Sequence, residues 1–432
     1  MSKLAINGGS KVREKPFPDW PIFDEQELKL LTEVLNSGKW WRGAYSSVEL
    51  GGGIVSGRSK VEEFEEKFSA HHKAKYAVAT SHGSDALDIA IKALGVGPGD
   101  EVIVPPYTFV ATATSVLHNN AIPIFVDIHP DTYNLDPNKI EEAITDRTKA
   151  IIPVHFGGAL ADMGRINQIA KKYNIRVIED AAHAHGVEWE NGKMAGTFGD
   201  IGMFSFQQSK NMAAGEGGIV ITNDEELYSL CFSYHHYGRE KGRPWYEIHR
   251  LGWNFRMTEF QGAVLIPQLG RLERLNAKRT ENAKYLTNKL SQIDGLVPLT
   301  VDSRIFKPSY YLYIFKYNKN AFKEIPRDVF IKALNSEGIP ITQGYDFPIY
   351  KNPLFLTKNF SNNQCPVNCS YFSKDINYSS FEEKCPVSEK ACNEEALWLT
   401  QNLFIGNKND INDICDAIWK IIENLDELLK IS

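Results

Sequence analysis

The amino-acid sequence predicts an α/β protein, with a mostly parallel sheet in a large domain and a smaller α+β domain at its C-terminal end. Two observations favour this fold class. Between about residues 60 and 225, short apolar runs alternate with amphipathic helical patterns, which is typical of a parallel sheet covered by helices on both faces. After about residue 270 the pattern changes to a long charged helix, a strand-like run and a final amphipathic helix. We therefore expect a large domain over residues 1–270, including an N-terminal segment, and a smaller domain over residues 271–432.

The first elements of the large domain can be justified in order. "SKVEEFEEKF" is an amphipathic helix pattern, and Ser59 followed by Glu62 predicts a capping box at its start. The run "YAVAT" is a short strand. In "SDALDIAIKALGVGPGD" we expect a helix that starts at Asp85 and ends before Gly95, because glycine commonly follows a helix C-terminus.

The later elements follow the same pattern. Further strands are expected at "EVIVPP", "IPIFVDI", "AIIPVHF", "IRVIED" and "GIVITN". In the smaller domain we expect a helix at "LGRLERLNAKRTENAKYLTNKL", acting as the hinge, a strand at "YYLYIFKY" and a last helix at "NDINDICDAIWKIIENLDELLK".

Composition and charge describe an ordinary soluble protein. The 432 residues are 43% hydrophobic and 24% charged, with a net charge of −6, so we expect no nucleic-acid partner. The first residues contain no signal-peptide pattern, and no apolar run reaches the roughly 18 residues of a membrane span. We therefore expect a cytoplasmic protein with no membrane partner.

The cysteines give a weak indication of metal binding. Four of the six lie within Cys365–Cys392, but no C-x-x-C pair is present. A zinc site is one interpretation; free thiols and no metal are the interpretation that we favour.

The stretch "FSFQQSKNMAAGEGG" contains a lysine with unusual neighbours. Lys210 is surrounded by uncharged residues, and Glu216 is the nearest acid along the chain. We expect Ser205 and Lys210 to lie on an irregular segment where the lysine loses water on folding, as a nucleophile or base would. A structural lysine is the alternative.

Three other groups fall at the carboxyl ends of predicted strands, where open α/β sheets bind ligands. Gly83 and Ser84 follow "YAVAT", Phe109 follows "EVIVPPYT", and Asp180 closes "IRVIED". Each has a simpler interpretation: an N-cap turn for "HGSD", a core residue for Phe109 and a helix cap for Asp180.

Taken together, these groups suit pyridoxal 5'-phosphate. A helix N-terminus with a hydroxyl binds a phosphate. An acid keeps a ring nitrogen protonated, an aromatic residue stacks on the ring, and a lysine forms a Schiff base with the aldehyde.

At this point the chain resembles a known family. The segments "SHGSDAL", "GVGPGDEVIVPPYTFVATA", "VIEDAAHAHG", "FSFQQSKNMAAGEGG" and "LGWNFRMTEFQGAVLIPQL" are similar, in order, to those of the DegT/DnrJ/EryC1/StrS sugar aminotransferases. These belong to the fold-type I pyridoxal-phosphate enzymes, and the resemblance covers essentially the whole chain.

The resemblance implies a role for each site residue. Lys210 forms the Schiff base and moves protons, Asp180 pairs with the ring nitrogen, and Phe109 stacks on the ring. The phosphate is held at Gly83, Ser84, the amide of Asp85, Ser205 and, from the neighbouring subunit of a homodimer, Asn254. His183 replaces the glutamine that is common in relatives, so it is expected to contact the ring's phenolic oxygen and to add a pH dependence.

The resemblance also implies the reaction. The expected activity is a transaminase with ping-pong kinetics, in which glutamine or glutamate donates the amino group. The segments "LAINGGSKVREKPFPDWPIFDEQE", "SGKWWRG", "KNPLF" and "CPVSEKA" resemble the branch that holds inosose aminotransferases and 3-amino-5-hydroxybenzoate synthases, which indicates a ketocyclitol or keto-sugar acceptor. Trp40, Trp41 and Arg42 are candidates to line the substrate pocket.

Three alternatives remain open at this point. One is a dehydrating and aromatising enzyme of the 3-amino-5-hydroxybenzoate synthase type. Another is an aminotransferase of nucleotide-linked keto-sugars. The last is a sensor that binds the cofactor without turning over, which would be expected to lose the lysine or to carry an extra DNA-binding segment.

Overall fold

The computed structural model describes residues 3–45, 57–361, 366–367 and 376–430. In this part of the chain the helices are α1 Glu25–Ser37, α2 Lys60–His71, α3 Gly83–Ala93, α4 Ala111–His118, α5 Pro137–Ala143, α6 Met163–Tyr173, α7 Glu225–His235, α8 Glu259–Leu290, α9 Arg327–Ser336, α10 Pro353–Leu356, α11 Phe381–Lys384, α12 Pro386–Lys390, α13 Lys408–Glu423 and α14 Leu425–Leu428. The strands are β1 Tyr76–Thr80, β2 Glu101–Val104, β3 Ile122–Phe125, β4 Thr148–Ile151, β5 Arg176–Asp180, β6 Glu188–Trp189, β7 Ile201–Ser205, β8 Gly218–Thr222, β9 Leu296–Pro298, β10 Ile305–Lys307, β11 Leu312–Tyr317 and β12 Ala396–Thr400.

A seven-stranded sheet forms the centre of the molecule, in the order β1-β8-β7-β5-β4-β2-β3. The strands from β7 to β3 pair in parallel, whereas β8 is antiparallel to both β1 and β7. The prediction of an α/β fold with a mostly parallel sheet is confirmed.

Strand β7 was missed by the sequence interpretation, which expected Ser205 on an irregular segment. Ser205 is in fact the last residue of β7 and pairs with Gly218 of β8. The strand carries Gly202, which packs so closely on Gly196 that an added Cβ would lie 2.3 Å from it. A glycine inside a strand weakens the apolar pattern by which strands are recognised.

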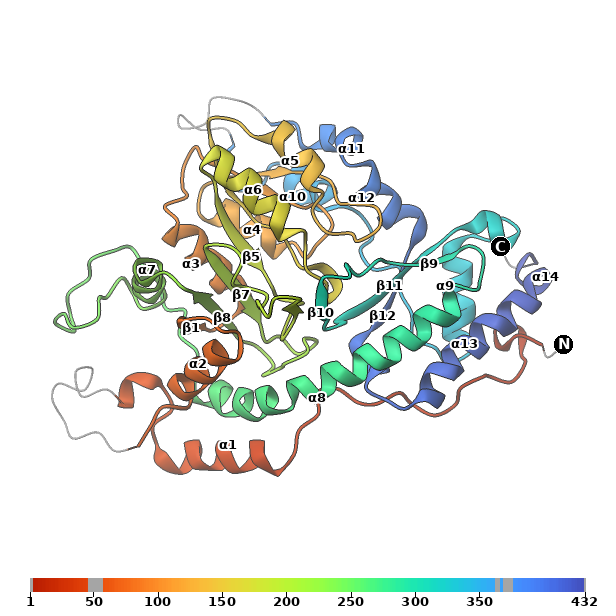
Figure 1. Ribbon diagram of the computed structural model, residues 1–432, viewed down its shortest axis with the longest axis horizontal. Coiled ribbons are helices and arrows are strands. Elements are labelled where there is room, and N and C mark those ends of the chain that lie inside the picture. Colours follow the sequence, from red (N-terminus) through yellow and green to blue (C-terminus); the bar gives the residue numbers. More distant parts are fainter. Residues whose placement is uncertain (1–2, 46–56, 362–365, 368–375, 431–432) are drawn as a thin grey trace.

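Helices cover both faces of the sheet (Figure 1). Along β2, Val102 and Val104 pack with α3, α4 and α7, whereas Ile103 packs on the other face with α5 and α6. Helices α2 and α8 cover that second face beside β1 and β8. Because both faces are buried, the strands read as continuous apolar runs.

Two helix starts differ in detail from the sequence prediction. Ser59 does cap α2, accepting the Glu62 N–H at 3.2 Å, but the Glu62 side chain binds Arg42 instead of closing a capping box. Helix α3 starts at Gly83, two residues before the expected Asp85, because the backbone is extended as far as His82.

A second core lies around the three-stranded antiparallel sheet β12-β11-β9, packed by α9, α13, α14 and the C-terminal part of α8. The final helix pattern is divided into α13 and α14 at Asn424. Helix α8 crosses from the first core to this one (Figure 1), so the predicted division at residue 270 falls within it. That division stays a prediction.

The start of the chain packs on the second core. Leu4 is fully buried there, and the amides of Ala5 and Val12 donate to the Glu337 carboxylate at 2.8 and 3.1 Å. Arg13 pairs with Asp410 at 2.9 Å. The first described residues also reach α14, where the Leu4 N–H donates to the Glu427 carboxylate at 3.3 Å.

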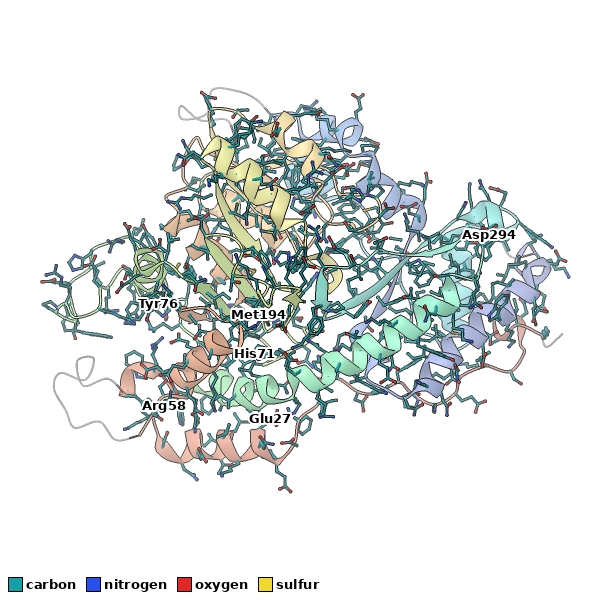
Figure 2. The ribbon with its side chains drawn as sticks, viewed as in Figure 1. Glu27, Arg58, His71, Tyr76, Met194 and Asp294 are labelled. Atoms are coloured by element: carbon teal, nitrogen blue, oxygen red, sulfur yellow. The ribbon has the colours of Figure 1, made fainter. Side chains whose placement is uncertain are left out.

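Side chains fill the space between the layers (Figure 2). Glu27, labelled there, joins α1 to α8 by accepting a hydrogen bond from Arg271 at 3.0 Å. Within the described residues, no helix has the length and apolar character needed to cross a bilayer.

Candidate active site

A cavity of about 660 Å³ lies at the carboxyl ends of the central strands. The start of α3, the loop after β2, the end of β5 and the loop between β7 and β8 form one side. Tyr311, Leu312, Tyr345 and Trp398, all from the C-terminal part of the chain, form the other. The sequence predicted the first side as the site; it gave no signal for the second.

The start of α3 offers uncapped backbone amides to this cavity. The side chain of the N-cap residue His82 accepts no hydrogen bond from the backbone amides of the first turn, because its ring binds the Asp85 carboxylate at 2.9 Å instead. Gly83 packs directly on Ser205, where an added Cβ would lie 2.7 Å from the serine Cβ. Ser84 is exposed at the cavity and Ser205 also lines it. Uncapped helix N-termini bind anions.

Asp180 lies on the floor of the cavity and is 5% exposed. Its carboxylate accepts hydrogen bonds from the Thr112 hydroxyl at 2.8 Å and from the Ala182 amide at 3.2 Å. Burial raises the pKa of Asp180, and the Thr112 bond and the Lys210 charge partly oppose this rise. No helix starts directly after Asp180, because residues 181–187 form only turns and irregular backbone. The helix-cap interpretation of Asp180 is therefore wrong.

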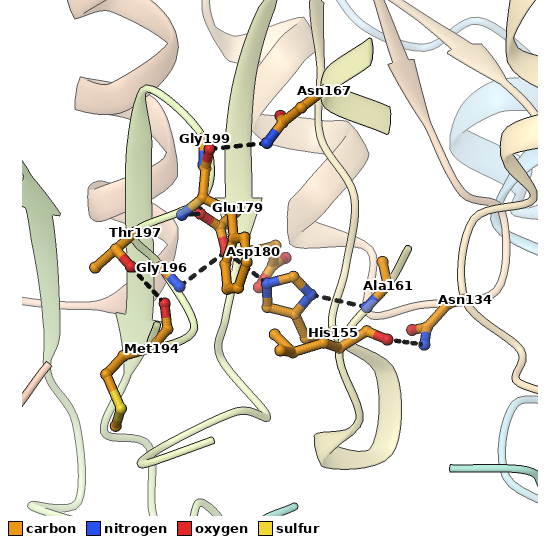
Figure 3. A network of polar contacts seen from close by, with 12 residues as sticks. Asn134, His155, Ala161, Asn167, Glu179, Asp180, Met194, Gly196, Thr197 and Gly199 are labelled. Carbon is orange, nitrogen blue, oxygen red and sulfur yellow. Dashed lines mark hydrogen bonds and ion pairs between the residues drawn. The ribbon is translucent and has the colours of Figure 1, made fainter. Parts of the chain in front are cut away.

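A buried network behind Asp180 holds the end of β5 (Figure 3). The Glu179 carboxylate accepts the His155 Nε2–H at 2.8 Å and the amides of Gly196, Phe198 and Gly199 at 2.8, 2.5 and 2.6 Å. The backbone N–H of His155 also donates to the Asp180 carbonyl at 3.0 Å. Successive strand residues face opposite sides, so fixing Glu179 on one side directs Asp180 toward the cavity.

Lys210 lies on the loop between β7 and β8 and is partly buried. Its Nζ is 4.4 Å from the centre of the Tyr311 ring, and it makes no ion pair with any described residue. The Tyr311 hydroxyl is 2.9 Å from the Ser209 hydroxyl. A lysine with no acidic partner, facing a cavity, is unlike an ordinary structural lysine.

His183 also stacks on the Tyr311 ring, with ring centres 4.2 Å apart and planes at 30°. Its Nδ1 accepts the Gly157 N–H at 3.4 Å, which leaves the proton on Nε2. Burial, together with the Lys210 charge, holds the pKa of His183 well below its usual range. The ring is therefore neutral near pH 7, and the expected pH dependence from this histidine does not arise there.

The remaining predicted residues lie at different places. Phe109 lines the cavity and is 60% exposed, so the interpretation of Phe109 as a core residue is wrong. Asn254 is exposed, pairs through its backbone with His236 and lies outside this cavity. Trp40, Trp41 and Arg42 also lie outside it, and Arg42 binds Glu65 at 2.9 Å.

Residues outside the predicted site complete the cavity. Thr112 binds Asp180, and Tyr311 contacts both Lys210 and His183. The two residues in each of these pairs are far apart in the sequence, so only the folded structure shows the contact. The sequence does identify "YYLYIFKY" as a strand, but Tyr311 lies directly before β11, and no local pattern tells that it faces a cavity lined mostly by residues 82–216. Of the cysteines, Cys385 and Cys392 are buried free thiols, and Cys365 and Cys369 lie outside the described residues.

Comparison with known proteins agrees with this geometry. The model of the DegT/DnrJ/EryC1/StrS aminotransferase family matches residues 21–386. The chain belongs to this family. It is therefore an enzyme of an aminotransferase family, as the sequence predicted, and the family depends on pyridoxal phosphate.

Individual relatives of this family member match over nearly its full length. A Streptoalloteichus tenebrarius protein, provisionally named L-glutamine:3-amino-2,3-dideoxy-scyllo-inosose aminotransferase, is 37% identical over 99% of both chains. The crystal structure of 3-amino-5-hydroxybenzoic acid synthase is 33% identical, with a TM-score of 0.79 over 94% of this chain and 100% of that one. NtdA of Bacillus subtilis, solved with its cofactor PMP, is 28% identical, with a TM-score of 0.75 over 96% and 87%.

Proposed function

We propose that this protein is a pyridoxal-phosphate-dependent aminotransferase that moves an amino group from glutamine or glutamate to a ketocyclitol or keto-sugar. One observation carries the proposal: a single cavity is lined by Lys210, which has no ion pair among the described residues, by the buried Asp180 and by the uncapped start of α3. Each supplies one of the contacts that this cofactor requires.

The described residues fit the cofactor. Its phosphate would be held by the first amides of α3, including that of Asp85, and by the hydroxyls of Ser84 and Ser205. Gly83 is needed because a Cβ there would lie 2.7 Å from the Ser205 Cβ. Phe109 would lie on the ring. Asp180 is a buried carboxylate with hydrogen bonds but no ion pair to any described residue, so a protonated ring nitrogen would supply the missing cation.

The side chains then have separate tasks. The bound cofactor would supply the electron sink for the reaction. Lys210 Nζ would take the proton from the substrate carbon that carries the transferred nitrogen, and the Tyr311 ring would hold this amine between transfers. The neutral His183 would donate from Nε2 to the phenolic oxygen of the ring, a bond that does not change near pH 7.

The proposed site is shared between two subunits. Asn254 is exposed and makes no contact with the cavity of its own chain, as expected of a residue that binds the phosphate in a neighbouring subunit. Exposed apolar side chains lie just before it: Tyr246 is 88% exposed, Leu251 81% and Trp253 65%. A homodimer that covers this surface would bring Asn254 to the partner's site.

The acceptor is inferred from similarity. The 37% identical relative is named for an amino-inosose, which supports a six-membered polyhydroxylated ring. The likeness to 3-amino-5-hydroxybenzoic acid synthase supports a second candidate, in which Lys210 acts as the base for dehydration and aromatisation. Transfer of one amino group to the ketone for each donor consumed would exclude it.

The function is tested with the purified protein. Borohydride reduction followed by peptide mapping should place a cofactor adduct on Lys210, whereas Lys278→Ala, a change on the outer face of α8, should leave the adduct unchanged. Glutamine is then used to convert the bound cofactor to its amino form. Candidate ketones are added, and the reaction is followed by the absorbance of the cofactor. An adduct on another lysine, or no reaction with any polyhydroxylated cyclic ketone, would contradict the proposal.

A further inference from the structure

One wall of the cavity consists of aromatic side chains from the C-terminal part of the chain. Trp398, in β12, and Tyr345, after the bridge between Thr342 and Trp398, face the cavity together. We call these two residues the aromatic wall. Asp180 and Lys210 reach the same cavity from the central sheet and its loops, so a substrate would lie between the two sets.

The aromatic wall is held rigidly. The Trp398 Nε1–H donates to the Tyr107 hydroxyl at 3.1 Å, and its backbone exchanges hydrogen bonds with Thr342 at 2.8 and 3.2 Å. Gly344, at φ +81°, lies against the indole, where an added Cβ would be 2.2 Å from the ring. The Tyr345 ring meets the indole edge to face, with centres 4.9 Å apart. Both rings are therefore fixed before any substrate enters.

The aromatic wall carries no charge. The acids and the lysine that line the described cavity all come from residues 85–216, whereas the C-terminal part contributes Tyr311, Leu312 and the aromatic wall. The Tyr345 hydroxyl has no hydrogen-bond partner among the described residues. Burial raises the pKa of Tyr345 well above its usual range, so this hydroxyl keeps its proton and can donate.

We propose that the aromatic wall recognises the acceptor by packing on the C–H face of a saturated ring, while the Tyr345 hydroxyl binds a ring hydroxyl. This inference rests on the proposed function. A cyclic polyol presents a flat apolar face and an outer edge of hydroxyls, which matches two fixed rings with one free donor. An open-chain polyol must lose conformational freedom to present the same face, so the aromatic wall favours rings.

Two matched ligands test this selectivity. Myo-inositol and mannitol are both six-carbon hexols without a keto group, one cyclic and one open. Each is titrated into the cofactor-loaded enzyme and measured by tryptophan fluorescence and by inhibition of the acceptor half-reaction. The wild type should bind myo-inositol more tightly than mannitol.

Variants test whether the aromatic wall causes the preference for the cyclic hexol. Tyr345→Leu and Trp398→Leu should each weaken myo-inositol binding about three- to tenfold, as expected for the loss of one aromatic contact. Tyr345→Phe keeps the ring and loses the donor, for an expected weakening of about two- to tenfold. Trp419→Leu, which changes a half-exposed tryptophan on α13, is the control and should bind both hexols as the wild type does. In the other three variants, mannitol binding should fall less than myo-inositol binding.

The outcomes separate this inference from the proposed function. Equal binding of the two hexols by the wild type, or no change in Tyr345→Leu, would overturn the role of the aromatic wall. Tyr345→Leu decides the question if Trp398→Leu fails to fold around Gly344. Failure of the proposed function would appear elsewhere, as a missing cofactor adduct on Lys210 or no reaction with an amino donor in the wild type.

Discussion

Replacing Asp180 by asparagine changes one atom at the floor of the cavity and removes the buried negative charge. The amide has the same shape and still meets the Thr112 hydroxyl and the Ala182 N–H. Phosphate contacts at α3 are untouched, and the ring nitrogen can bind opposite the amide without its proton, so no unpaired buried charge remains. We therefore expect the affinity for the cofactor to stay within about threefold of the wild type.

The expected loss of rate is large because Asp180 is only 5% exposed. The reaction needs the ring in its protonated form, and this form would lack its buried partner, a loss of about 3–5 kcal/mol. At about 1.36 kcal/mol for each factor of ten, the amino-transfer rate should fall about 150- to 5,000-fold. A carboxylate at the surface would be screened by water, and its loss would cost far less.

The assay is single-turnover absorbance of the donor half-reaction, with circular dichroism to verify folding. Asp224→Asn is the matched control, because Asp224 caps α7 through the amides of Glu226 and Leu227 and asparagine keeps that cap. The control should retain full activity. Near-normal turnover by Asp180→Asn, with the cofactor bound, would refute the assigned role of the carboxylate.

Three further results are expected. Asn254→Ala should weaken cofactor retention about ten- to a hundredfold, as for one hydrogen bond to a charged group; mixing it with inactive Lys210→Ala subunits should restore activity, and no gain after verified subunit exchange would mean that the site is not shared. Gly83→Ala forces a Cβ to 2.7 Å from Ser205, so overpacking should lower stability by about 1–3 kcal/mol in thermal unfolding and loosen the cofactor. Because burial depresses the pKa of His183, the unfolded chain takes up a proton below about pH 6.5 that the folded chain does not. The free energy of unfolding should therefore fall as the pH drops through this range, and it should fall less steeply in His183→Gln. The pH profile of the rate from about pH 6 to 8 should have the same shape in the wild type and in His183→Gln.

The sequence predicted the parts of the fold that depend on local pattern. Strands such as "IRVIED" and "EVIVPP" were found because a sheet buried on both faces gives unbroken apolar runs. Strand β7 was not found, since Gly202 serves the close packing on Gly196 and interrupts the pattern. The antiparallel direction of β8 has no local signature at all, because direction is decided by how the chain crosses the sheet.

The candidate site divides in the same way. Lys210, Asp180 and the α3 start were predicted because motifs adjacent to strand ends carry them. Tyr311, Tyr345 and Trp398 were not, because their approach to Lys210 depends on the packing of the second core against the first. The expected pH sensitivity of His183 was wrong for a related reason: it is burial, which sequence alone does not give, that lowers its pKa.

The attachment of the first residues to Glu337 and Asp410 has a consequence for synthesis of the chain. These residues leave the ribosome first, yet the acids they bind belong to the last hundred residues, and the core that buries Leu4 is built from residues 283–428. The N-terminal segment therefore cannot form its contacts with Glu337 and Asp410 until most of the chain has been translated, and contacts of such long sequence separation form slowly. A chain cut short before α13 would keep its complete central sheet and Glu337, but it would lose Asp410 and the buried side chains of α13, so its N-terminal segment would be bound only in part.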